Sequence, residues 1–143
     1  MKWKSSRTVA ENARLLLPKL ADKYFKAGRK AAGEEAPSAK DLHRFRIATK
    51  RFRYSLELFR PVYGDTLETH IRSLRELQNV LGALSDYHSL ERLFQGDREL
   101  RAKLDRATSR KLREFRAAWR AFDSDDRRER WNQYLTRKTR RRA

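Results

Sequence analysis

The chain has 143 residues, about the length of one domain, and 38% of them are charged. With 36 Lys and Arg against 19 Asp and Glu, its formal net charge is +17, so we expect its partners to be polyanions: nucleic acid, an anionic membrane surface or a free polyanion. The absence of cysteine excludes disulfides and thiolate zinc sites, and no apolar run suits a signal peptide or a membrane span, so we expect a soluble, cytoplasmic protein without a membrane partner.

Helical periodicity runs through almost the whole chain, and no segment alternates as a strand does. We expect a first helix over about 6–30, kinked or broken near Pro18, because proline removes a backbone donor. A loop is expected over 31–39. Ser38 is then a suitable N-cap for a second helix, which we expect to stop at Arg60, before a proline.

The second half of the chain is also predicted to be helical. A third helix is expected to begin at Gly64, and Gly82 either ends it or marks a tight packing contact. A fourth helix over about 85–94, a fifth over about 97–122 and a short one around 130–135 complete the pattern. Because short connections favour antiparallel neighbours, the predicted fold is all-α, an antiparallel helical bundle of about five to six helices.

One domain is expected, over 1–135, followed by a basic tail over 136–143. Such a tail is a generic electrostatic element that binds nucleic acid without specificity.

The second helix has the most informative pattern, because its side chains form three stripes at 100° per residue. One apolar stripe is the predicted core face: Phe45, Phe52, Leu56 and Phe59. Another lies on nearly the opposite side: Ile47, Tyr54 and Leu58. Between them runs a stripe that is basic except for its last member: His43, Arg46, Lys50, Arg53 and Glu57. Apolar residues on both sides predict that this helix is packed on both sides, with its basic stripe lining a groove or pore.

A basic stripe in such a groove suits a chain of phosphates. Its cations recur about once per helical turn, every ~5 Å of rise. The guanidinium of Arg offers a planar set of donors for phosphate oxygens, and the ammonium of Lys offers a compact point charge. Apolar walls strengthen the electric field of both. Glu57, four residues after Arg53, is placed to orient that guanidinium. The competing interpretation is a solvated charged face, but a single acid can neutralise little of this stripe.

Two stretches of the chain resemble a known family. LHRFRIATKRFRYSLELF at 42–59 resembles the signature helix of CHAD domains, the conserved histidine α-helical domains. ELQNVLGALSD at 76–86 resembles the second block of the family, and ENAR at 11–14 and LP at 17–18 resemble the helix that precedes the signature. The resemblance covers about residues 8–122.

The resemblance implies helical bundles in two related halves and a basic channel or groove that binds inorganic polyphosphate. Carried over by position, it implies the anion-binding residues His43, Arg46, Lys50 and Arg53, with Glu57 and Asp86 orienting them. This chain has one such helix, similar to the C-terminal half of the family pattern. We therefore predict that two chains pair as a homodimer about a two-fold axis to rebuild the double unit.

Other charged faces are candidates for extending the anion path. They are Lys19, Lys23 and Lys26 of the first helix and Arg106, Arg110 and Arg113 of the fifth. A solvated surface is the alternative for both sets. His70 and His88 are isolated, so we expect no metal site, and no motif indicates a cofactor.

Two other functions remain open at this stage. The overall charge and the tail also suit a non-specific nucleic-acid or ribosome-associated binding protein. An enzyme acting on phosphoanhydrides normally needs carboxylates that hold metal ions beside the phosphates, and the basic stripe offers only Glu57. We therefore expect a binding protein without catalytic residues.

Overall fold

The computed structural model describes residues 2–137, apart from the side chains of 125–129, and this range contains five helices and no strand. The helices are α1 (Val9–Gly33), α2 (Ala39–Tyr63), α3 (Thr66–Leu93), α4 (Arg98–Phe122) and α5 (Asp125–Thr136). The predicted all-α fold of about five to six helices is confirmed. Most of the predicted basic tail, residues 138–143, lies outside the described range.

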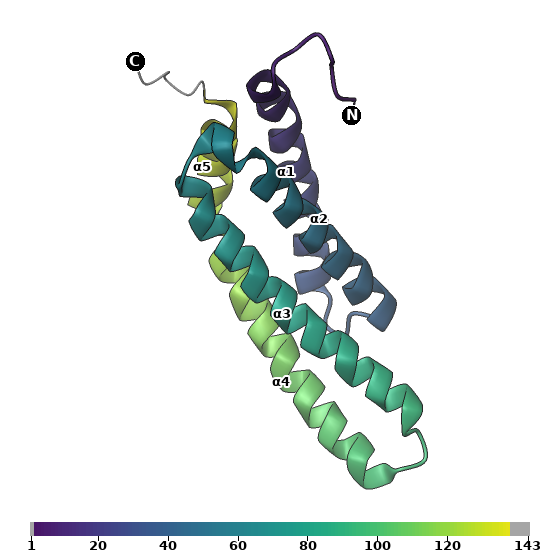
Figure 1. The fold of residues 1–143 in the computed structure, drawn as a ribbon. Coiled ribbons are helices and arrows are strands. Elements are labelled where there is room, and N and C mark those ends of the chain that lie inside the picture. Colours follow the sequence, from purple (N-terminus) through teal and green to yellow (C-terminus); the bar gives the residue numbers. More distant parts are fainter. Residues whose placement is uncertain (1, 138–143) are drawn as a thin grey trace.

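Helices that are neighbours in sequence pack side by side: α1 on α2, α2 on α3 and α3 on α4, while α5 returns to α1 (Figure 1). The α3–α4 pair forms a long antiparallel hairpin. Its connecting end projects beyond the end of the bundle where α1 turns into α2, and the start of α1 and the helix α5 lie towards the opposite end (Figure 1).

Polar side chains cap three of the helices at their first turns. Thr8 and Glu11 form a capping box at α1, with Thr8 Oγ1 accepting from the Glu11 amide at 3.1 Å. Ser38 Oγ accepts from the Asp41 amide at 3.1 Å, which confirms the predicted start of the second helix. Asp97 caps α4 in the same way.

Two predicted helix ends are wrong, and the first helix is not broken at Pro18. α1 continues through Pro18, α2 continues through Pro61 to Tyr63, and α3 is a single helix through Gly82 where two were expected. Each proline removes one backbone hydrogen bond, and burial of neighbouring side chains such as Leu17 and Tyr63 offsets that loss. α2 ends instead at Gly64, whose positive φ of 77° suits glycine.

The core between α1, α2 and α4 is rich in aromatic rings. Tyr24 stacks on Phe45 and Phe52, with ring centroids 5.2 and 4.8 Å apart, and its hydroxyl hydrogen-bonds Thr49 Oγ1 at 2.9 Å. Burial raises the pKa of Tyr24, so the phenol stays neutral. The predicted core face of α2 is therefore confirmed.

Gly28 of α1 provides the space that Trp119 of α4 fills. A Cβ at Gly28 would overlap the indole ring, whereas a Cβ at Gly33, the last residue of the same helix, would meet nothing within 4 Å. We expect Gly28→Ala to lower the free energy of unfolding by about 1–3 kcal/mol through overpacking. Gly33→Ala should be neutral or stabilising by up to about 1 kcal/mol. Urea unfolding of both variants tests this, and two changes of the same sign would contradict it.

Candidate functional site

The predicted basic stripe lies on α2 along its contact with α3. We call His43, Arg46, Lys50 and Arg53 the basic seam. His43 is exposed, and the other three are half-buried. Among the described residues, Arg53 alone of the four forms an ion pair, so the positive charge of the seam is only partly neutralised.

The expectation that α2 is packed on both sides is wrong for a single chain. Ile47, Tyr54 and Leu58 on its outer side are 38%, 54% and 72% exposed. The helices that contact α2 most extensively, α1 and α3, leave this outer stripe uncovered. One chain therefore supplies one wall of the predicted groove, α3, and leaves the other side open.

Arg46 of α2 lies against Gly82 of α3. A Cβ at Gly82 would be 3.8 Å from Arg46 Nη2 and 3.9 Å from Nε, which is ordinary van der Waals contact. The Nε atoms of Arg46 and of Arg53 are buried without a hydrogen-bond partner in the described part of the chain. Buried donors are rarely left unpaired, because each costs about 1–3 kcal/mol. The cations of the seam that no described carboxylate neutralises make it a candidate for binding an anion.

Glu57 joins two arginines from different helices. Its Oε1 lies 3.5 Å from Arg53 Nη1 and accepts a hydrogen bond from Arg75 Nη2 of α3 at 3.1 Å. The guanidinium of Arg53 also lies over the ring of Tyr54, 4.7 Å from its centroid. Glu57 thus forms an ion pair with Arg53, and its orienting role stays a prediction. Sequence reasoning missed Arg75, because only the α2–α3 register brings it to Glu57.

Asp86, the second predicted orienting residue, is exposed and pairs with no other described side chain. Arg46 faces Gly82 and Glu57 faces Arg75, so α2 and α3 run antiparallel. In this register Asp86, one turn beyond Gly82, lies level with His43. Its predicted role therefore stays a prediction.

The structure places the two candidate extensions on different surfaces. Lys23 lines a cleft of about 270 Å³ between α1 and α2 together with Arg44 and Arg51, two cations that sequence reasoning did not single out. Lys19 is exposed, and Lys26 pairs with Asp22 at 3.5 Å. On α4, the exposed side chains of Arg106, Arg110 and Arg113 line a shallow depression. No residue of the basic seam lines this depression.

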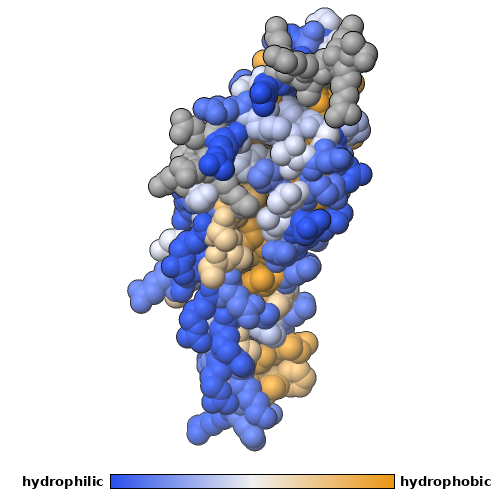
Figure 2. Space-filling view, turned by 90° about the vertical axis from the view of Figure 1, so that its left-hand side faces the viewer, coloured by the Kyte–Doolittle hydropathy of each residue, from blue (hydrophilic) through white to orange (hydrophobic). Residues whose placement is uncertain are grey.

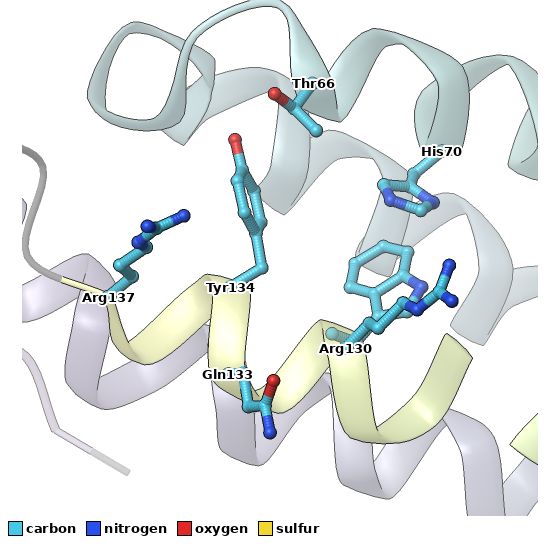
Figure 3. A pocket seen from close by; sticks show the side chains of 7 residues that line it. Thr66, His70, Arg130, Gln133, Tyr134 and Arg137 are labelled. Carbon is cyan, nitrogen blue, oxygen red and sulfur yellow. The ribbon is translucent and has the colours of Figure 1, made fainter. Parts of the chain in front are cut away.

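A larger cleft, of about 620 Å³, lies between the start of α3 and α5. Figure 3 shows His70 reaching into it from α3, Tyr134 rising from α5, and Arg137 just after the end of that helix. The His70 ring packs on Trp131 with centroids 4.1 Å apart, and Tyr134 donates a hydrogen bond to the Tyr63 carbonyl at 2.6 Å. These contacts hold α5 on the bundle, so we interpret this cleft as structural.

Within residues 2–137, the described side chains include no group of three or more His, Asp or Glu placed to hold a metal ion. No described helix is long and apolar enough to cross a membrane.

The protein is all-helical. The basic residues of its signature helix, α2, lie along the neighbouring helix α3. The family model of the CHAD domain matches residues 2–95, about two thirds of the chain, and the chain therefore belongs to this family. Neither a curated protein nor a solved structure matches the chain. The matched range contains α1, α2 and α3, so the whole basic seam lies inside it.

Proposed function

We propose that the chain binds inorganic polyphosphate, or a similar phosphate-rich polyanion, along the basic seam. The observation that carries this proposal is a row of half-buried cations, Arg46, Lys50 and Arg53, with a single carboxylate beside them. Membership of a family associated with polyphosphate binding supports it. The CHAD match alone does not assign these residues a role.

In this proposal the chain binds without hydrolysing its ligand, and two copies form a homodimer. Exposed apolar side chains support the pairing, because a second chain can cover them. A preparation that releases phosphate from polyphosphate in the presence of Mg²⁺, and loses this activity on substitution of Glu57 or Asp86, would instead indicate an enzyme.

The double substitution Lys50→Ala with Arg53→Ala tests the seam. Each charge-assisted hydrogen bond contributes about 1.5–3 kcal/mol, so we expect polyphosphate affinity to fall at least about tenfold, measured by calorimetry at fixed salt. Arg106→Ala with Arg110→Ala on α4 removes the same charge and should have a much smaller effect. Unchanged affinity in the seam variant, with loss of binding on deletion of 136–143, would show that the tail binds the anion.

Competition separates this proposal from general nucleic-acid binding. At equal phosphate concentration and equal salt, polyphosphate should displace a labelled polyphosphate probe better than RNA does. RNA that competes equally well would favour the nucleic-acid alternative.

A further inference from the structure

The projecting end of the α3–α4 hairpin exposes apolar side chains. Leu93 is 75% exposed, Phe94 47% and Leu90 39%. α1 and α2 do not extend to this end, which leaves the hairpin uncovered there, and Figure 2 shows an apolar patch near this end of the molecule. We call Leu90, Leu93 and Phe94 the hairpin patch. A cluster of large apolar side chains at an exposed end indicates an interaction surface.

The charge around the hairpin patch differs from that of the whole chain. Residues 85–105 contain five acids against four Lys and Arg, a net charge of −1 with His neutral, in a chain whose net charge is +17. Acids and bases alternate closely here, as in Glu91 and Arg92 or Asp97 and Arg98. This end therefore does not attract a polyanion or an anionic membrane, and it does not repel another copy of this cationic chain.

The outer stripe of α2 is the other exposed apolar face, and its surroundings are different. Cations flank it on both sides: Arg46, Lys50 and Arg53 towards α3, and Arg44 and Arg51 towards α1. Two such faces brought together without an anion would repel each other. Charge therefore favours the hairpin end over α2 as the place where two free chains meet.

We propose that a second copy of this chain docks on the hairpin patch, so that two hairpin ends pack against each other about a two-fold axis. A two-fold contact uses the same patch on both chains, and the near-neutral mixture of acids and bases suits such self-pairing. That two chains pair rests on the proposed function; where they pair is inferred from the hairpin patch. It requires no polyphosphate.

Light scattering after size exclusion, without polyphosphate, tests the contact with two variants. Leu93→Asp with Phe94→Asp should convert the dimer to a monomer, whereas Leu58→Asp on the outer stripe of α2 should leave it dimeric. Both sites are exposed, and unchanged circular dichroism verifies folding. A monomeric wild-type chain, or a hairpin variant that remains dimeric, overturns the proposal, as does a monomeric Leu58 variant.

The chain has no cysteine, which allows a second, independent readout. A cysteine introduced at exposed Gln95, beside the hairpin patch, should form a disulfide-linked dimer on mild oxidation, whereas one introduced at exposed Lys19 should not. Equal cross-linking at both positions contradicts the contact. Affinity for a short polyphosphate, too short to bridge two seams, is measured on the same variants. It should not change with the hairpin substitutions, so failure of the dimer contact and failure of the seam give different results.

Discussion

Replacing Arg46 and Lys50 together by glutamate is expected to reduce polyphosphate affinity by about a hundredfold or more. Neither side chain pairs with a carboxylate among the described residues, so the change breaks no ion pair within the protein. It removes two charge-assisted contacts, each contributing about 1.5–3 kcal/mol, and adds repulsion of the ligand. Calorimetric titration at one fixed salt concentration measures the effect.

The matched control is Arg106→Glu with Arg110→Glu on α4. It changes the net charge by the same amount at exposed residues of α4, which line a depression that contains no residue of the seam. Because salt screens exposed charges beyond about 8–10 Å, this control should lose far less affinity at physiological ionic strength. Equal losses in the two variants would mean that overall charge, and not the seam, binds the anion. Circular dichroism of each variant shows whether it is folded.

Trp131→Ala is expected to cause the largest loss of stability, about 3–5 kcal/mol in the free energy of unfolding. Trp131 is 2% exposed and is the anchor of α5. Its ring lies 5.6 Å from that of Phe52, 5.8 Å from Phe122 and 6.1 Å from Phe25. Truncation removes this aromatic packing and the support of His70, so α5 loses its main attachment to the bundle.

Urea unfolding compares the stability of the Trp131→Ala variant with that of the Trp3→Ala variant. Trp3 is 51% exposed and stacks on Phe59 at 6.3 Å, so its loss should cost about 1 kcal/mol or less. Trp131→Phe should fall between the two, because it keeps an aromatic ring and removes an indole N–H that is buried without a partner. Similar midpoints for Trp131→Ala and Trp3→Ala would contradict the proposed anchoring of α5.

Apolar periodicity and helix-capping patterns in the sequence predicted the class of fold and the buried face of α2. The 3.6-residue period predicted every helix and the core face of α2, since apolar periodicity marks the side that a helix buries. Capping chemistry identified the start at Ser38, because its hydroxyl satisfies an amide only three residues away. The same rules failed at Pro61, where the helix continues, and at Gly82, where one helix runs through an expected division. The cost of a helix breaker is local, but the packing that offsets it comes from other helices.

The amino-acid order was thus sufficient to place four cations on one side of α2 and to identify the family, because both depend on spacing within short stretches. It was not sufficient to decide what covers α2. Ile47, Tyr54 and Leu58 read as a second buried face, and the fold leaves them exposed. Only the packing of α2 on α3 brings Arg75 to Glu57 and Arg46 to Gly82, since contacts between helices depend on their register and on which neighbours are present.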